Sequence, residues 1–381
     1  MEQLVIREER NYGIDLFRFI SMFMVVVLHV LGHGGVLESN IAGFKLYALY
    51  YLETLCIIAV NCFALISGYL NYNKKFSLKR ILNLWLQVFS INAVVSILFI
   101  ILKKEAFNFG VLLNIIFPIL RTDYWYFTCY FMILILMPLL NIIIEKTPKS
   151  SILAVLSVVG VFIGILTLFA TYFTLFDFES GYTVSWLAYL YLWGGVVRKY
   201  NLRLKFLDNK KWVYLVLYLI SSVLSLAISF NVKESFNYHS VYYYTNIFNL
   251  INSVLLLMYF SGLNIKKNKV ISYLSTTSFA VYLLHEQSYV RKHLIKNQFV
   301  FLAESNVFVV YGIVLLSVAV IYLCCSIIET LRQQIFKLLR INKVVDKMNI
   351  KFTKSCEVLA NLIDKNDVKN ENEASNKKAS Q

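Results

Sequence analysis

Charged residues and proline are both scarce in this chain of 381 residues. Asp, Glu, Lys and Arg together make up 15% of the sequence, there are 3 Pro, and 59% of the residues are hydrophobic. Soluble domains carry about 25% charged residues and about 45–50% apolar ones. The shortage of charge therefore argues against a soluble globular protein.

Cysteine patterns are also missing. The six Cys include no Cys-x-x-Cys pair, so the sequence predicts neither a zinc site nor a disulfide framework. His33 follows His29 by four residues, a spacing that suits a metal pair on a helix. No third ligand stands beside them in the sequence, and we expect no metal.

Long apolar runs dominate the chain instead. An α-helix needs about 20 apolar residues to cross about 30 Å of hydrocarbon, and these runs are too continuously apolar for the alternating strands of a barrel. We therefore predict an all-α fold, a polytopic integral membrane bundle of about ten transmembrane helices. The predicted spans are residues 13–33, 47–70, 82–102, 124–144, 152–173, 184–198, 213–230, 243–263, 271–288 and 306–328.

Basic residues are distributed unevenly around these spans. With ten spans, 28 of the 37 Lys and Arg residues fall on the side of the two termini and 8 on the other, with Arg18 inside a span. Cytoplasmic loops carry the excess of Lys and Arg, so we expect both termini in the cytoplasm. This topology accounts for the net charge of +15, and no motif for nucleic-acid binding is present.

Three regions follow from this reading. Residues 1–12 form a cytoplasmic N-terminus without a cleavable signal peptide, because charged residues precede a full-length span. Residues 13–330 form the membrane domain, and residues 331–381 form a basic cytoplasmic tail. The polar end of the tail is expected to be disordered. Because no linker or appended catalytic domain is visible, we expect the activity to reside in the membrane bundle.

The first span contains Asp15, Arg18 and His29. Ionisable groups inside a span cost about 2.5–3.5 kcal/mol each, which makes them functional candidates. Eleven residues separate Arg18 from His29, which places them within about 20° on one helical face and about 16 Å apart along the axis. Asp15 is spaced to pair with Arg18. Alternatively, Arg18 snorkels to the interface and His29 is a hydrogen-bond partner between helices.

The ninth span carries a second polar stripe. Ser275, Ser278, Tyr282 and His285 recur at intervals of three and four and so line one helical face. The topology puts His285 in the outer half of its span, as it does His29. The alternative interpretation is packing between helices through small polar residues.

The second span and the loop after it offer a different chemistry. Ser67 and Gly68 lie near the cytoplasmic end of the span, and Lys79 and Arg80 belong to the basic cluster beyond it. Arg and Lys suit a phosphorylated cytoplasmic ligand. Helix packing and positive-inside topology are the simpler explanations.

Together, these segments resemble the acyltransferase-3 family of ten-span membrane proteins. The matching elements, in order, are Asp15 with Arg18-x10-His29, Phe63 to Tyr69 with Ser67-Gly68, then Lys79-Arg80, then Trp125-Tyr126-Phe127 with Pro138, and Ser278 with Tyr282-Leu283-Leu284-His285. Members transfer acyl groups, commonly acetyl from acetyl-CoA, onto surface or secreted glycans and lipids. The resemblance covers residues 12–328 and favours the single-module subgroup that lacks an SGNH hydrolase domain.

The resemblance implies a membrane O-acyltransferase. It is expected to move acetyl from acetyl-CoA, a co-substrate and not a tightly bound cofactor, to a hydroxyl of a cell-surface or exported polysaccharide or its lipid-linked precursor. The expected location is a bacterial cytoplasmic membrane. The implied roles are catalysis for His29, Arg18 and Asp15, donor binding for Lys79, Arg80, Ser67 and Gly68, and acceptor or oxyanion binding for Ser278, Tyr282, His285 and Trp125.

Two other functions stay open at this point. Ten spans with polar residues inside also suit a transporter or flippase of a glycan or small solute, although no inverted repeat is evident. A polysaccharide polymerase is a weaker alternative, because such enzymes depend on large external loops. Oligomeric state is not indicated.

Overall fold

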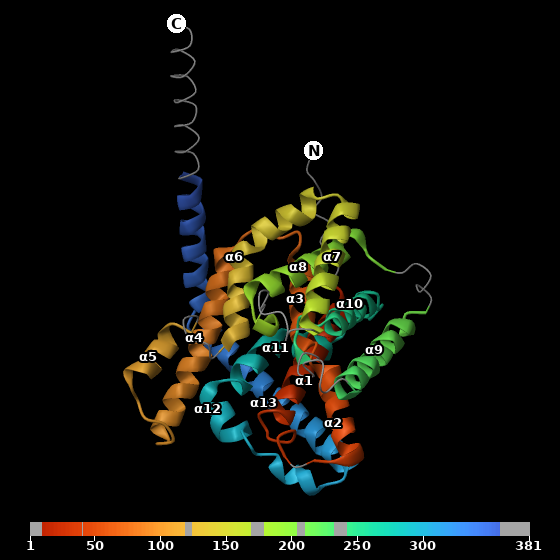
Figure 1. Ribbon diagram of the computed structural model, residues 1–381. Helices are drawn as coiled ribbons and strands as arrows, with labels where there is room; N and C mark the ends of the chain where they lie inside the picture. The colour runs from red at the N-terminus through yellow and green to blue at the C-terminus, as the bar shows by residue number, and fades with distance from the viewer. Residues whose placement is uncertain are drawn as a thin grey trace, which may run out of the picture.

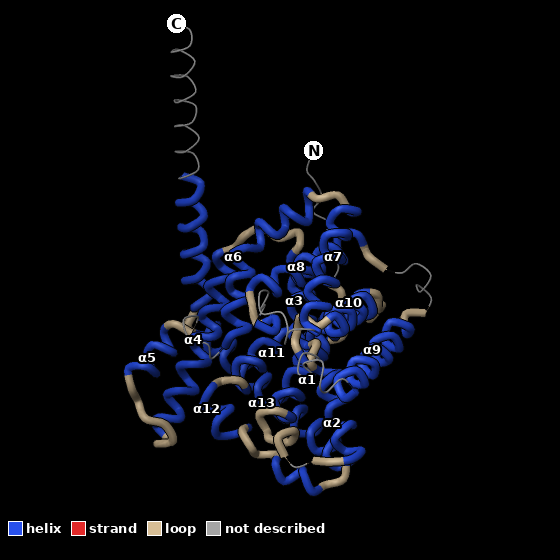
Figure 2. Tube along the Cα trace, in the orientation of Figure 1, coloured by secondary structure: helices blue, strands red, loops and turns tan. Residues whose placement is uncertain are grey.

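The computed structural model describes residues 10–39, 41–118, 124–168, 179–203, 210–231 and 242–358. Across these ranges the chain is helical and contains no strand (Figure 2). The helices are α1 (Tyr12–Leu31), α2 (Gly43–Cys56), α3 (Ala59–Asn71), α4 (Leu78–Ile101), α5 (Phe109–Ile116), α6 (Trp125–Lys146), α7 (Lys149–Leu168), α8 (Val184–Tyr200), α9 (Trp212–Asn231), α10 (Ile247–Ser261), α11 (Lys269–His285), α12 (Ser288–Val290) and α13 (Val307–Leu338).

Six of the described segments are long and apolar enough to cross a membrane. They are α1, the pair α2–α3, α4, α6, α7 and α13. Two shorter apolar helices, Trp212–Ile228 within α9 and Ile247–Ser261, lie where the seventh and eighth spans were predicted. Helices α8 and α11, of 17 residues each, occupy the sixth and ninth. The all-helical, multi-span class is confirmed, whereas the count of ten and the sides of the termini stay predictions.

Two segments differ from the sequence-based boundaries. The apolar run at 47–70 is not one helix, because α2 and α3 are separated by a turn at Ile57 and Ile58. Helix α13 continues to Leu338, so the predicted boundary between residues 330 and 331 falls inside it. A further helix spans residues 341–358 and projects away from the bundle (Figure 1). Residues 1–9 and the tail after 358 lie outside the described ranges.

Helix α1 occupies a central position and contacts α2, α3, α10, α11 and α13 (Figure 1). It begins at Asn11, whose side-chain oxygen accepts hydrogen bonds from the backbone N–H groups of Gly13 and Ile14. A Cβ on Gly13 would lie 2.1 Å from the carbonyl oxygen of Phe260. Only glycine therefore lets the start of α1 approach the end of α10 this closely, which fixes the helix that carries His29.

Candidate active site

His29 and His285, the two histidines singled out by the sequence, meet in the structure. His29 Nδ1 lies 2.8 Å from His285 Nε2. His285 Nδ1 lies 2.5 Å from the carbonyl oxygen of Val281, one turn earlier in α11. A carbonyl oxygen only accepts, so His285 Nδ1 carries a proton and its Nε2 accepts one from His29 Nδ1. This assignment leaves the Nε2 lone pair of His29 free to take a proton.

Glu286 supplies a negative charge beside the same ring. Its Oε2 lies 3.0 Å from His29 Nδ1, and its side chain is only 9% exposed. The other oxygen, Oε1, pairs with Arg291 and lies 3.8 Å from His33 Nε2. Within the described chain Oε2 accepts no aligned hydrogen bond, so its effect on His29 is electrostatic. A proton gained by His29 would create an imidazolium that this carboxylate stabilises.

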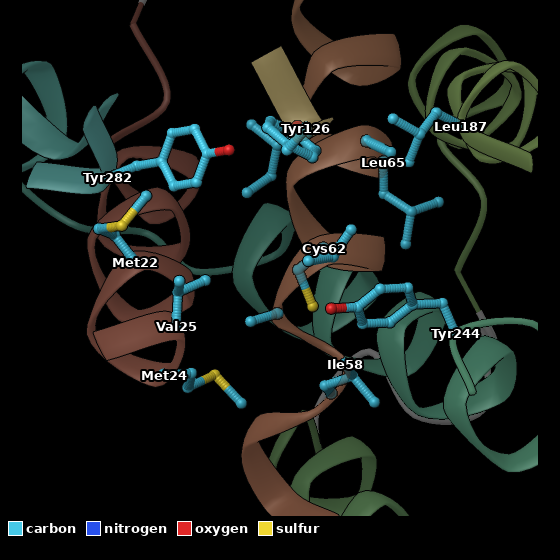
Figure 3. Packing of buried hydrophobic residues seen from close by; sticks show 14 of the residues in the cluster. Met22, Met24, Val25, Ile58, Cys62, Leu65, Tyr126, Leu187, Tyr244 and Tyr282 are labelled. Atoms are coloured by element: carbon cyan, nitrogen blue, oxygen red, sulfur yellow. The ribbon is translucent and has the colours of Figure 1, made fainter. Parts of the chain in front are cut away.

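A small enclosed cavity of about 60 Å³ borders His29 and Glu286. Its other walls are apolar and aromatic side chains from α1, α3, α6, α11 and the segment before α10. They are Met22, Val25, Leu28, Val60, Phe63, Trp125, Tyr126, Tyr244, Phe279 and Tyr282. Figure 3 shows Met22, Val25, Tyr126, Tyr244 and Tyr282 among the buried side chains of this region. Charges that develop between such largely apolar walls interact more strongly than they do in water.

Tyr282 is the one cavity residue with an uncommitted hydroxyl group. The hydroxyl oxygen is buried and has no hydrogen-bond partner among the residues the structure describes. Figure 3 shows the ring of Tyr282 directed toward Tyr126. Tyr126 belongs to the first turn of α6, where backbone N–H groups lack partners within the helix, and Tyr124 provides no side-chain cap there. The backbone N–H groups of Tyr126 and Phe127 lie close to the hydroxyl oxygen of Tyr282, so the hydroxyl and these amides form one group of donors suited to a developing oxyanion.

Trp125, the acceptor candidate that lies on α6, also lines this cavity. Its ring packs against Tyr182 at a centroid distance of 4.4 Å and against Tyr244 at 5.8 Å. The structure thus brings Trp125, Tyr282, His285 and His29 together, from α6, α11 and α1. Ser278 is buried on the same helix as Tyr282, but its hydroxyl donates to the carbonyl of Ser275.

Asp15 and Arg18 do not form the pair that their spacing predicts. Asp15 is buried, accepts a hydrogen bond from Ser275 and pairs with Arg10 at 2.5 Å. Arg18 is half-buried and makes no hydrogen bond or ion pair with the described residues. Its charge lies near the hydroxyl of Tyr322 on α13. Arg10, rather than Arg18, pairs with Asp15 because Arg10 precedes the helix and its side chain can fold back onto the carboxylate. Arg18 is therefore available to an anion.

Ser67 and Gly68 are engaged in helix structure. The Ser67 hydroxyl donates to the carbonyl of Phe63 in its own helix. A Cβ on Gly68 would lie 1.9 Å from the carbonyl oxygen of Tyr191 on α8. These contacts are those of tight packing between α3 and α8, and the donor-binding role of both residues stays a prediction.

Lys79 and Arg80 have different surroundings. Lys79 pairs with Asp346 at 2.6 Å, with both side chains 47% exposed. Arg80 reaches the neutral groups of Asn71 and Met137 and lines a cleft of about 640 Å³ with Arg332 and Lys337. Of the two predicted phosphate ligands, Arg80 is therefore the one that faces a space large enough for a substrate.

A family model described as an acyltransferase domain, that of the acyltransferase-3 family, matches residues 11–327. The chain belongs to this acyltransferase family. The match begins at the N-cap of α1 and ends within α13, so it contains every residue of the cavity. Neither a curated protein nor a solved structure matches the chain. Membership in an acyltransferase family favours group transfer over the transporter and polymerase alternatives.

In this acyltransferase, His29, His285 and Glu286 also have the ligand types of a metal site. One ligand atom from each lies within 4.8 Å of the others. The two imidazole nitrogens are, however, within hydrogen-bond distance of each other, a geometry that also suits a proton-transfer pair. The sequence-based expectation of no metal stays a prediction.

Glu286 and Arg291 are functional candidates that the sequence did not reveal. Glu286 directly follows His285 but lies near the end of a predicted span, where a charged side chain can reach water and so does not indicate a function. Arg291 was assigned to an external loop. The signal that finds them is spatial, because Glu286 meets His29 only when α1 and α11 are packed together, and Arg291 in turn pairs with Glu286.

The segment that carries Arg291 is also held by hydrogen bonds to the connection that follows α4. Glu105, after α4, accepts hydrogen bonds from Lys292 and His293, each at 2.6 Å. The Lys292 hydrogen bond, followed by that of His293, lowers the pKa of the Glu105 carboxyl. The carboxylate form is thus retained to lower pH, and with it the contact beside Arg291.

Proposed function

We propose that this protein transfers acetyl from acetyl-CoA to a hydroxyl group of a cell-surface or exported polysaccharide or its lipid-linked precursor. The observation that carries the proposal is the hydrogen-bonded pair of His29 and His285. It assigns the free lone pair to His29 Nε2 at a cavity that also contains an uncommitted Tyr282 hydroxyl. A sugar hydroxyl is a weak nucleophile at neutral pH and needs such a base.

In the proposed reaction His29 Nε2 accepts the proton of the acceptor hydroxyl as its oxygen attacks the thioester carbonyl carbon. The carbonyl oxygen becomes an oxyanion, which Tyr282 and the first-turn amides of α6 stabilise. The carbon–oxygen double bond re-forms as the carbon–sulfur bond breaks, and the leaving thiolate takes from His29 the proton that came from the acceptor hydroxyl. Glu286 stabilises the imidazolium between these two steps.

The size of the cavity favours a short acyl group. A water molecule needs about 10–15 Å³ measured in this way, so a cavity of about 60 Å³ has room for about four such positions. This matches the few heavy atoms of an acetyl group and excludes a long fatty acyl chain without rearrangement. Purified enzyme should therefore use acetyl-CoA in preference to octanoyl-CoA.

The donor is proposed to approach from the end of the bundle where α1 begins. The cleft at Arg80 lies there, since Arg80 stands at the start of α4 and Lys337 at the end of α13. Arg80 and Lys337 offer positive charge to the phosphates of CoA, whereas Arg332 is already paired with Glu329 in the same cleft. Arg18, without a partner in the described chain and about three turns before His29, is the next cation toward the cavity.

The test is transfer of radiolabel from acetyl-CoA by the full-length protein in nanodiscs, with surface polysaccharide as the acceptor. Replacing His29 with Gln is expected to lower the rate by about 10²–10⁴-fold, the usual contribution of a general base. His293→Gln is the matched control, because His293 contacts Glu105 and does not line the cavity. Normal transfer by well-folded His29→Gln protein would show that His29 is not the base.

A further inference from the structure

A second basic pocket, which the proposed reaction does not use, lies at the N-terminal end of α1. The start of α1, Arg203 after α8, Lys211 before α9, and the connection between α10 and α11 line a space of about 660 Å³. Five of the lining residues are cations, namely Arg10, Arg203, Lys211, Lys266 and Lys267. This pocket is separate from the cleft at Arg80, with which it shares no lining residue.

These positive charges are poorly compensated. No Asp or Glu lines the pocket within the described ranges, and Asp15, which pairs with Arg10, is buried beneath it. Lys211 donates to the backbone carbonyl of Gly262 at 2.5 Å, a neutral partner. The Nε atom of Arg203 is buried and has no hydrogen-bond partner in the part of the chain that the structure describes. A buried, unpaired guanidinium donor is costly, and an anion in the pocket would satisfy it.

The helix ends around the pocket add to its preference for anions. Helix α1 begins at Asn11 and helix α11 begins just after Lys267 and Asn268. Asn11 and Asn268 already accept hydrogen bonds from first-turn N–H groups, so these helix ends contribute through their partial positive charge, about half a unit each.

With the predicted spans, the pocket falls at the depth of lipid headgroups. It joins the ends of membrane helices α1, α9, α10 and α11. Trp212, directly after Lys211 at the start of α9, is 59% exposed, and exposed Trp is typical of the membrane interface. Leu263 and Ile265 line the pocket next to the cations, as suits a phosphate that is attached to acyl chains.

We propose that this pocket binds the phosphodiester headgroup of an anionic phospholipid. The phosphate places one negative charge among these cations and accepts a hydrogen bond from Arg203. Because Arg10 and Asn11 begin the helix that carries Arg18 and His29, the bound lipid fixes the position of that helix in the bilayer. Anionic lipids bind basic pockets between membrane helices by the same attraction.

The test is native mass spectrometry of the detergent-purified full-length protein, titrated with phosphatidylglycerol or with phosphatidylcholine. We expect the wild-type protein to retain phosphatidylglycerol and to lose the zwitterionic lipid. The double variant Lys266→Gln/Lys267→Gln should weaken phosphatidylglycerol binding by about tenfold or more, since each basic residue contributes to such binding. Both side chains are exposed, so their replacement should leave the fold intact, which the unfolding midpoint in detergent checks.

The matched control is Lys343→Gln/Lys347→Gln, which removes the same charge from two exposed residues of the helix at 341–358. Equal weakening in the control would overturn the proposal, as would equal retention of both lipids by the wild type. Displacement of phosphatidylglycerol by adenosine 3′,5′-bisphosphate would also overturn it, because it would assign the pocket to a soluble phosphate. This experiment measures lipid binding, so its result does not depend on whether the protein transfers acetyl groups.

Discussion

At the scale of single residues, the hydroxyl of Tyr282 separates a catalytic function from a structural one. It is buried without a hydrogen-bond partner among the described residues, so Tyr282→Phe removes an unsatisfied polar group and should not lower the unfolding midpoint. If the hydroxyl stabilises the oxyanion, kcat should fall by about 10²–10³-fold. Thermal unfolding in detergent and acetyl transfer, measured on the same preparation, check both parts.

Tyr218→Phe is the control for this prediction. The hydroxyl of Tyr218 donates to the carbonyl of Leu55 at 2.6 Å and does not line the cavity. Its loss should cost about 1 kcal/mol of stability and leave kcat unchanged. The opposite pattern, with Tyr282→Phe less stable but fully active, would rule out the oxyanion role of Tyr282.

Glu286 is a positioning and charge-stabilising residue, and its replacement tests that assignment. Glu286→Gln keeps the shape but removes the charge beside His29, so we expect kcat to fall by about a hundredfold while KM for acetyl-CoA stays the same. Glu286→Asp should recover part of the loss. A change in KM alone would instead place Glu286 in substrate binding.

The sequence was most informative about residues inside membrane spans and least informative about their partners. The cost of a buried ionisable group pointed to His29 and Arg18, and helical spacing pointed to Tyr282 and His285. The pairing of Asp15 was wrong because local spacing ignores Arg10, which reaches back from outside the helix. The contact between His29 and His285 bridges 256 positions, which no local pattern encodes.

At the scale of helices, two glycines hold α3 against α8. A Cβ on Gly68 would lie 1.9 Å from the carbonyl oxygen of Tyr191, and one on Gly194 would lie 2.0 Å from that of Leu65. Small residues at such positions let backbones approach closely. Gly68→Ala should therefore lower stability by about 1–3 kcal/mol through overpacking, seen as a lower unfolding midpoint in detergent.

Gly312→Ala on α13 is the matched substitution, because nothing lies within 4 Å of an added Cβ there. It should leave the midpoint unchanged or raise it slightly, since alanine favours a helix by up to about 1 kcal/mol. Should Gly68→Ala keep its midpoint and instead raise KM for acetyl-CoA, the residue would belong to the donor site, as the sequence predicts.

Apolar patterning predicted the positions of most helices but not all of their boundaries. Most predicted spans lie on described helices because hydrocarbon thickness sets their length. The turn at Ile57 and Ile58 was missed because the chain there remains apolar and has neither Pro nor Gly. The extension of α13 to Leu338 was missed because the apolar pattern marks only the part of a helix that lies in hydrocarbon, whereas the helix itself continues into polar residues.

At the scale of the whole molecule, the proposed donor cleft and the cavity share no lining residue, so their variants should affect different kinetic constants. Arg80→Gln should raise KM for acetyl-CoA about tenfold with little change in kcat, because it removes binding charge far from the reacting atoms. Lys79→Gln should have a smaller effect, since Lys79 is already paired with Asp346. Equal effects of the two variants would mean that only general surface charge attracts the donor.

The orientation of the bundle can be tested through α13. Its 32 residues extend about 48 Å at 1.5 Å per residue, more than the roughly 30 Å of hydrocarbon. Glu304, just before α13, and Cys356, on the helix after it, are both exposed and should therefore face opposite compartments. In intact spheroplasts a membrane-impermeant maleimide should label Glu304→Cys in a Cys356→Ser background, and should label Cys356 only after permeabilisation. The reverse pattern would turn the bundle over and place the cleft at Arg80 away from cytoplasmic acetyl-CoA.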